Sequence, residues 1–245
     1  MHFRLLTIFP EFFTGIFEHG VVGRAIKAGL VQTTVHNLRD WTHDRHKTVD
    51  DRPFGGGEGM LLKPEPIFDA VESIWPERTP EQKVVLLSAQ GRLFRQSTAR
   101  ELVQSKELLL ICGRYEGVDE RVAEHLADEE LSVGDFVLSG GELGAALIMD
   151  VVARLVPGVI GNEASTIFES FQPDHETGQT LLDCPQYTRP AVFRGWSVPE
   201  VLVGGNHAEI RRWRRQAALE KTARQRPDLL GAAEETGKPA QEMRE

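Results

Sequence analysis

Three short segments place glycine beside polar residues directly after an apolar run. They are SAQGR (88–92), CGRYEG (112–117) and LSGGEL (138–143), and the runs before them lie at 83–88, 108–112 and 136–138. The runs are typical of buried strands, and ligands of open α/β sheets bind in the loops that leave the strands. Because glycine lets backbone groups approach a ligand closely, the three loops predict a pocket for an adenine- or nucleoside-bearing molecule. Tight packing of the turns themselves is the alternative reading.

Several common nucleotide motifs do not occur in the chain. It has no G-x-G-x-x-G and no G-x-x-x-x-G-K-[ST], and GGGEGM (55–60) has the wrong spacing. A standard dinucleotide site and a triphosphate P-loop are therefore not expected. His43 and His46 could chelate a metal, but no cysteine is near, so the pattern favours a polar loop and predicts no metal site.

Charge is distributed unevenly along the chain, although its total of −9 argues against a nucleic-acid partner. Residues 101–150 hold 12 acidic residues against three basic ones. Residues 204–226 hold seven basic residues against two acidic ones. A local basic stretch is what a phosphate backbone responds to, whatever the total charge. A solvated helix face would explain the same composition.

Apolar runs alternate with helical spacing through the first two thirds of the chain. This pattern predicts an α/β fold with a mostly parallel sheet covered on both faces. Strands are expected at 3–9, 31–38, 83–88, 108–112 and 136–138, and helices at 11–28, 66–75, 92–103, 118–127 and 143–156. The glycine-rich, polar stretch 41–60 is expected to be a long loop.

Composition changes near residue 160, which predicts a division of the chain. We expect a ligand-binding domain over 1–160, a flexible linker over 161–180, and a domain over 181–245 that contains a basic helix near 207–224. Cys112 and Cys184 are too far apart in sequence and context for a disulfide framework or zinc site. No apolar run is long enough to span a membrane, and no secretory leader is apparent, so a cytoplasmic location is expected.

Seven segments, in family order from residue 5 to about 226, resemble the bacterial tRNA (guanine-N(1)-)-methyltransferase family called TrmD, of the SPOUT class. The longest are LLLICGRYEGVDERV (108–122), SVGDFVLSGGELGAALIMDVVARLVPGVIGNEAS (132–165) and VPEVLVGGNHAEIRRWR (198–214). The others are LLTIFPEFF (5–13), THDRHKTVDDRPFGGGEGM (42–60), SAQGR (88–92) and LLDCPQYTRP (181–190). Their length and specificity make a chance match untenable.

The resemblance implies a fold, a reaction and partners. The fold would be α/β with a deep trefoil knot, followed by a smaller helical C-terminal domain. The enzyme would be a homodimer with active sites at the subunit interface. It would transfer a methyl group from S-adenosylmethionine to N(1) of guanosine 37 in tRNAs where a guanosine precedes it, which protects the reading frame. Magnesium would assist the reaction.

The resemblance also assigns residues to the methyl donor in the three glycine loops. It implies donor binding by Leu86, Ser88, Gly113, Tyr115, Glu116, Gly117, Val133, Gly134, Asp135, Phe136, Val137, Leu138, Gly140 and Gly141. These are the loops that the residue pattern selects by itself.

Catalysis and tRNA binding are assigned in the same way. The resemblance implies that a carboxylate removes the N(1) proton and that Arg154 stabilises the charge that develops on the guanine oxygen. The carboxylate is Glu169, where the family usually has Asp, in a linker longer than usual. Expected contacts to tRNA, or to the partner subunit for the first two, come from Asp50, Arg52, Asn206, His207, Arg211 and Arg215.

Three other functions stay open on the sequence. One is a related RNA methyltransferase acting at another base or ribose, which would not be expected to share GNHAEIRRWR and the linker acid. Another is an RNA-binding protein that has lost catalysis. Glu169 supports it, as do Ala89 and Gly144, where the family usually has proline. A dehydrogenase is the least favoured, since its motif is missing.

Overall fold

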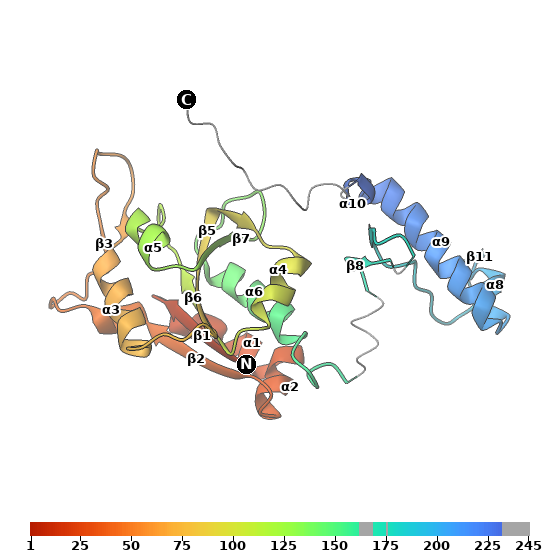
Figure 1. Cartoon of the computed structure of the whole chain (residues 1–245), viewed down its shortest axis with the longest axis horizontal. Coiled ribbons are helices and arrows are strands. Elements are labelled where there is room, and N and C mark those ends of the chain that lie inside the picture. Colours follow the sequence, from red (N-terminus) through yellow and green to blue (C-terminus); the bar gives the residue numbers. More distant parts are fainter. Residues whose placement is uncertain (162–168, 175, 232–245) are drawn as a thin grey trace. The chain divides into compact units, whose positions relative to one another are not determined.

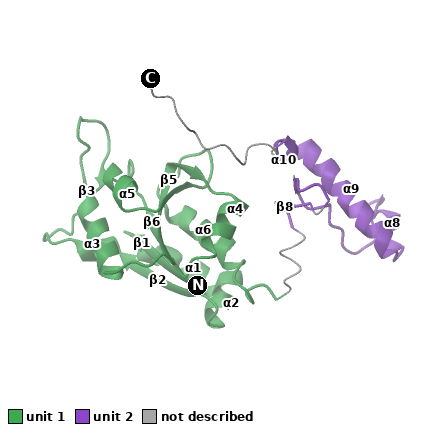
Figure 2. Ribbon diagram, viewed as in Figure 1, with its two compact units in different colours: residues 1–161 green, residues 162–245 purple. Residues whose placement is uncertain are grey.

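The computed structural model describes residues 1–161, 169–174 and 176–231. The chain divides into two compact units, Met1–Gly161 and Asn162–Glu245 (Figure 2). Each unit is described by itself below.

Unit 1 is built on a five-stranded sheet in which every neighbouring pair of strands is parallel. The order is β2–β1–β6–β5–β7, and the strands are β1 (His2–Thr7), β2 (Gln32–Asn37), β5 (Gln82–Leu93), β6 (Glu107–Cys112) and β7 (Glu129–Ser132). This confirms the predicted α/β class with a mostly parallel sheet. A central strand such as β6 is apolar after Glu107 because helices cover both faces of the sheet.

Side chains of the central strands alternate between two cores, which lie under helices on either side of the sheet. Figure 1 shows the sheet and these helices. Leu108 and Leu110 pack toward α2 (Gly20–Lys27), α4 (Gln96–Leu102) and α6 (Glu142–Ala153). Leu109 and Ile111 pack toward α3 (Pro64–Ile74) and α5 (Glu120–His125). Packing of helices on both faces holds the strands in position, and it therefore also sets the position of the edge at which the strands end.

The helix expected over 11–28 is divided into three pieces. They are η1 (Pro10–Phe13), α1 (Thr14–Glu18) and α2. The break falls at His19 and Gly20, where the extended backbone of His19 is followed by Gly20 at φ 69°. A glycine adopts this left-handed conformation without steric cost, and the helical path ends there.

The strand expected over 136–138 was predicted wrongly. The fifth strand of the sheet is β7, and residues 136–138 are irregular. The Phe136 N–H donates to the Gly134 carbonyl at 2.9 Å, a tight turn that is incompatible with a strand. The actual strand contains Glu129, which pairs with Lys83 and Arg92 at the sheet edge, so its charge concealed it from an apolar pattern.

The SAQGR segment lies inside β5 and not after it. Leu87 and Arg92 both align with Leu131 of β7, so the intervening residues bulge out of the ladder. The helix predicted from residue 92 consequently begins at Gln96. The long polar loop after residue 41 also contains a short element, since β3 (Asp50–Asp51) pairs antiparallel with β4 (Leu61–Leu62), and η2 (Leu38–Trp41) precedes it.

Unit 2 contains a long helix with short hairpins beside it. The helix α9 (His207–Gln225) corresponds to the predicted basic helix, and Asn206 caps it by accepting hydrogen bonds from Ala208 and Glu209. The other elements are β8 (Gln172–Pro173), β9 (Thr180–Leu181), β10 (Val192–Phe193), β11 (Trp196–Ser197), α8 (Glu200–Val203) and α10 (Asp228–Gly231). The β8–β9 hairpin lies within the segment predicted as a flexible linker, whose residues 162–168 and 175 are outside the described part.

Candidate functional site

A pocket of about 350 Å³ lies at the carboxyl edge of the sheet in unit 1. The ends of three adjacent strands, β6, β5 and β7, supply most of its wall. Of the residues assigned to the methyl donor, those that line it are Leu86, Ser88, Gly113, Tyr115, Glu116, Gly117, Val133, Phe136, Val137, Leu138, Gly140 and Gly141. Gly134 and Asp135 are not among its lining residues. The three loops found by their glycines therefore meet around one cavity.

Close backbone packing explains two of these glycines. The Gly141 N–H donates to the Gly113 carbonyl at 2.8 Å, which joins the second and third loops. A Cβ on Gly141 would lie 2.8 Å from Cα of Cys112 and 3.0 Å from Cβ of Leu87. A Cβ on Gly113 would lie 3.2 Å from the Leu87 carbonyl oxygen. Only glycine leaves the backbone this close to the neighbouring strand.

The second glycine loop (112–117) is hydrogen-bonded to residues 60–62, at the end of the long polar loop. The Glu116 N–H donates to the Met60 carbonyl, and the Leu62 N–H donates to the Gly117 carbonyl, each at 3.0 Å. Tyr115, at φ 61°, forms the exposed turn between them. Leu61 consequently joins the pocket wall, a role that nothing in the sequence pattern indicated.

An ion pair between Arg114 and the buried Glu142 supports the loops of the pocket. Glu142 is only 1% exposed and accepts from the Thr7 hydroxyl at 2.7 Å and from Arg114 Nε at 3.0 Å. Arg114 also donates to the Ser139 carbonyl at 3.0 Å, so it ties the second loop to the third. No spacing in the sequence indicates this pair, although both residues lie inside the glycine-loop motifs. A buried carboxylate needs such partners.

Cys112 lies beneath the same loops and is chemically quiet. Its complete burial, and then the charge of Glu142, raise the pKa of the thiol well above its ordinary value. A thiol that stays protonated is a poor nucleophile, so Cys112 acts as a packing residue of the hydrophobic core.

The other predicted site residues of unit 1 lie outside the pocket lining. Arg154 is the half-buried residue at which α6 ends. Asp50 is half-buried in β3, and Arg52 follows it with an exposed side chain. Glu169, the predicted base, belongs to unit 2, so it and Arg154 come from different units.

The basic residues of α9 fall into two environments. Arg211 is exposed, as are Asn206 and His207 at the start of the helix. Arg215, in contrast, donates to both oxygens of Asp174 at 2.9 and 3.0 Å and lies 2.9 Å from Glu176. Arg215 was predicted to contact tRNA, whereas the structure places its guanidinium against two carboxylates.

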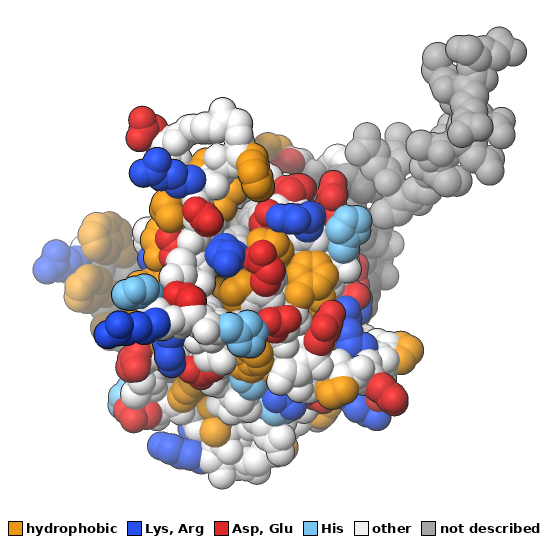
Figure 3. All heavy atoms as spheres, turned by 90° about the vertical axis from the view of Figure 1, so that its left-hand side faces the viewer, with side chains coloured by type: hydrophobic (Ala, Val, Ile, Leu, Met, Phe, Trp, Pro, Cys, Tyr) orange, Lys and Arg blue, Asp and Glu red, His pale blue; other side chains and the backbone are white. Residues whose placement is uncertain are grey.

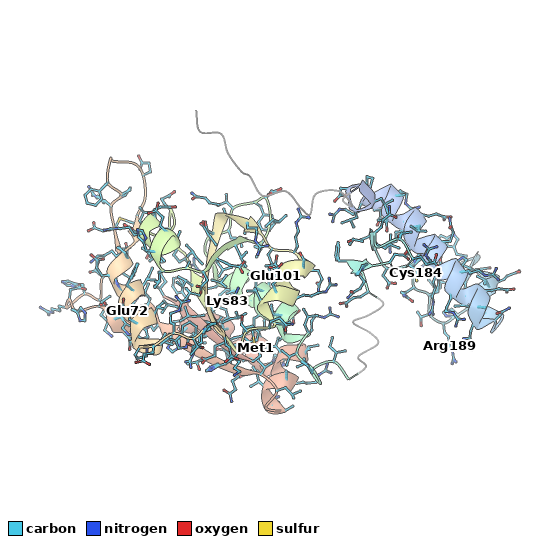
Figure 4. The ribbon with its side chains drawn as sticks, in the orientation of Figure 1. Met1, Glu72, Lys83, Glu101, Cys184 and Arg189 are labelled. Atoms are coloured by element: carbon cyan, nitrogen blue, oxygen red, sulfur yellow. The ribbon has the colours of Figure 1, made fainter. Side chains whose placement is uncertain are left out.

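Surface charge and cysteine placement complete the site description. On the face in view in Figure 3, acidic and basic side chains are interspersed. Cys184 lies beside α9, where it packs with Ala218, and Arg189 follows it along the same segment (Figure 4).

In the described part of the chain, no group of three or more His, Cys, Asp or Glu residues could hold a metal ion. No helix among those residues is long and apolar enough to cross a membrane.

Fold and pocket together define an α/β protein with a cavity at the carboxyl edge of a parallel sheet. The family model described as tRNA (Guanine-1)-methyltransferase TrmD matches residues 1–232. A tRNA (guanine-N(1)-)-methyltransferase of Koribacter versatilis is 60% identical, covering 96% of this chain and 94% of the relative. Proteins of the same name from Dehalococcoides mccartyi (strain 195) and Marinomonas sp. are 54% and 53% identical, covering 94% of this chain and 90% and 89% of the relatives. The chain belongs to the TrmD family of tRNA (guanine-N(1)-)-methyltransferases.

Proposed function

We propose that this protein transfers a methyl group from S-adenosylmethionine to N(1) of guanosine 37 in tRNAs that carry a guanosine at position 36. The observation that carries the proposal is the single pocket formed by the three glycine loops, in a chain that matches the family over 1–232. The modification would protect the reading frame. Membership of the family supports the guanine-N(1) chemistry, and the pocket supports a nucleoside-bearing donor.

The pocket residues fit S-adenosylmethionine. A volume of about 350 Å³ lies within the usual range for small-molecule sites. Leu61, Leu86 and Leu87 offer an apolar wall to an adenine ring, and the glycine loops offer backbone groups to its edges. When bound there, the donor would supply an electrophilic methyl group on a sulfonium. The loops of Gly113 and Gly141 would hold it in a fixed orientation, and positioning of this kind supplies much of the rate of a displacement reaction.

Glu169 and Arg154 have separate roles in the reaction at the guanine. N(1) of guanine carries a proton and becomes nucleophilic only when that proton leaves. The carboxylate of Glu169 accepts the proton. Negative charge then moves to the adjacent carbonyl oxygen of the base, where the guanidinium of Arg154 stabilises it. Glutamate carries one methylene more than the aspartate usual in the family, and the segment that bears Glu169 compensates for this extra length.

The exposed basic residues of α9 bind the tRNA backbone in this proposal. Arg211 and the start of the helix at Asn206 and His207 are exposed, and phosphates favour such surfaces. Asp50 and Arg52 contact the target bases or the partner subunit. Magnesium would assist the reaction without a preformed protein site.

A homodimer with active sites at the interface completes the proposal. Leu143 and Leu147 lie one turn apart on α6 and are 56% and 43% exposed. The exposed Phe9 and Phe12 follow Thr7, the residue that contacts the first turn of the same helix. Exposed apolar side chains grouped in this way are typical of protein interfaces. We also propose that the middle segments form the trefoil knot of the SPOUT class, and that the enzyme works in the cytoplasm.

Three transcripts that differ at one nucleotide test the proposal. Methyl transfer from labelled S-adenosylmethionine is measured with guanosines at 36 and 37, with adenosine at 36, and with adenosine at 37. We expect transfer to the first transcript and a large loss with each of the others. Transfer that survives adenosine at position 37 would indicate a different target nucleotide. Binding of tRNA without any transfer would indicate an RNA-binding protein that has lost catalysis.

A further inference from the structure

The carboxylate of Asp174 is one of the most constrained groups in unit 2. Its side chain is 8% exposed and accepts hydrogen bonds from Arg215 and from the backbone N–H groups of Glu176 and Thr177 at 3.1 and 2.9 Å. The Thr177 hydroxyl adds another at 2.9 Å. The guanidinium of Arg215, and then these hydrogen bonds, hold the pKa of Asp174 well below its ordinary value. The group therefore stays ionised and bound to α9 at any ordinary pH.

A series of hydrogen bonds extends from the residue that bears this carboxylate to Ser170, the neighbour of Glu169. The Asp174 N–H donates to the Gln179 carbonyl at 2.8 Å, which closes the β8–β9 hairpin. The Phe171 N–H donates to the Leu181 carbonyl at 2.7 Å, and Ser170 Oγ accepts from the Asp183 N–H at 3.0 Å. Ser170 directly follows Glu169. Phe171 and Ser170, which join the hairpin to the proposed base, are therefore both hydrogen-bonded to the segment 181–183.

The other strand of the hairpin is attached to the same helix. The Leu182 N–H donates to the Thr222 hydroxyl at 2.9 Å, and that hydroxyl donates to the Ala218 carbonyl at 2.7 Å. Thr222 is fully buried, and Leu181 packs against Ala218. The hairpin thus contacts α9 near Arg215 and again about two turns further along.

We propose that Asp174 and Arg215 form a clamp that positions Glu169 relative to α9. They are positioning residues and not catalytic or phosphate-binding residues. This inference rests on the proposed role of Glu169 and deepens it. Helix α9, which receives the tRNA backbone, and the segment that bears the base then move as one body. Engagement of the RNA by the helix would bring the carboxylate to the guanine.

The test compares Asp174→Asn with Glu220→Gln in the full-length protein. Glu220 is exposed on α9 and accepts from Gln216 at 2.8 Å, so its substitution also removes one carboxylate charge from unit 2 but leaves the clamp untouched. Single-turnover methyl transfer is measured at saturating tRNA and S-adenosylmethionine across a range of pH, with Glu169→Gln as the reference for loss of the base.

We expect Asp174→Asn to lower the single-turnover rate about tenfold to a hundredfold at neutral pH, because small displacements of a reacting group have effects of that size. The rate should recover toward alkaline pH, where N(1) of guanine loses its proton without a base, and Glu169→Gln should show the same pH dependence. KM for tRNA should change less than the rate. Glu220→Gln should match the wild type in rate and pH profile. An Asp174→Asn protein with the wild-type rate and profile would overturn the clamp and leave the proposed function intact.

Amide hydrogen exchange supplies a readout that does not depend on catalysis. In Asp174→Asn, exchange should accelerate at Phe171, Asp174 and Leu182 and stay unchanged in α6 of unit 1. Unchanged exchange at those amides would refute the clamp, whether or not the protein methylates tRNA. Absence of methyl transfer by the wild-type protein would reject the proposed function and would not bear on the exchange result. If Asp174→Asn unfolds unit 2, Thr177→Ala replaces it. That variant removes only one hydrogen bond to the carboxylate and should produce the same changes on a smaller scale, and their absence would equally reject the proposal.

Discussion

Adding one methyl group at Gly141 should damage the pocket by a predictable amount. The backbone of Gly141 has φ −75° and ψ −10°, which alanine adopts freely, so the only penalty is steric. The new Cβ would lie 2.8 Å from Cα of Cys112 and 3.0 Å from the Gly113 nitrogen, and neither backbone atom can move without shifting β6. Overpacking of this kind costs about 1–3 kcal/mol.

The loop that carries Gly141 yields more easily than the strand, because it is partly open to the pocket. We therefore expect Gly141→Ala to displace the third loop and to break its 2.8 Å hydrogen bond to Gly113. If the whole penalty falls on the binding-competent conformation, the Kd for S-adenosylmethionine should rise roughly five- to 150-fold, since about 1.4 kcal/mol corresponds to a factor of ten.

Gly144 provides a matched control three residues away on α6. A Cβ there would lie 3.4 Å from Leu87 Cδ1 and 3.5 Å from Val133 Cγ1, which are ordinary contacts. Replacing a helical glycine with alanine stabilises the helix by about 0.5–1 kcal/mol. Calorimetric titration with S-adenosylmethionine and thermal unfolding should therefore separate the variants, with Gly144→Ala at or above wild-type Tm and near wild-type Kd. A Gly141→Ala protein that binds the donor as tightly as the wild type would refute the packing argument.

Further predictions concern catalysis, tRNA binding, thiol reactivity and acid stability. At neutral pH, Glu169→Gln should abolish methyl transfer and leave the donor Kd unchanged in titration calorimetry, whereas near-normal turnover would exclude the residue as the base. Arg211→Ala should weaken tRNA binding and reduce the slope of log affinity against log salt by roughly 0.7–0.9, and an unchanged slope in a filter-binding series would place Arg211 off the phosphate surface. Burial raises the pKa values of Cys112 and Cys184, so both thiols of the folded protein should react slowly with a thiol reagent at mildly alkaline pH and quickly after denaturation; rapid labelling of the folded chain would contradict this. The lowered pKa of Asp174 stabilises unit 2 above the ordinary aspartate pKa of about 4, and that stability is lost as pH falls further. Asp174→Asn should therefore lower the free energy of unfolding by roughly 1–3 kcal/mol at neutral pH and by less in acid, as denaturant titrations at several pH values would show.

Local signals in the sequence predict the sheet where burial is complete and fail where charge intervenes. The apolar runs before Ser88 and Cys112 identify β5 and β6 because both faces of these strands are buried. The edge strand β7 carries Glu129 and Glu130, so a search for apolar runs does not detect it. Residues 136–138 are apolar and therefore resemble a strand in sequence, but they line the pocket.

The pocket was predictable from its glycines, but its supports were not. The three glycine segments are local patterns, and the fold of unit 1 brings them to one edge of the sheet. Thr7 and Glu142 are 135 residues apart, and no spacing rule connects them. Arg215 is a second example. Its positive charge is evident from composition, but its ion pair with Asp174 is not, because Asp174 lies 41 positions earlier in the sequence.

Mass spectrometry of digested tRNA tests the central claim most directly. An unmodified transcript with guanosines at positions 36 and 37 is incubated with S-adenosylmethionine and the wild-type, Glu169→Asp or Glu169→Gln protein, then digested to fragments that resolve each position. At neutral pH we expect a single methyl group on N(1) of guanosine 37 with the wild-type and Glu169→Asp proteins, and none with Glu169→Gln. A methyl group at another atom or nucleotide, or no methyl group on tRNA that the wild-type protein demonstrably binds, would contradict it.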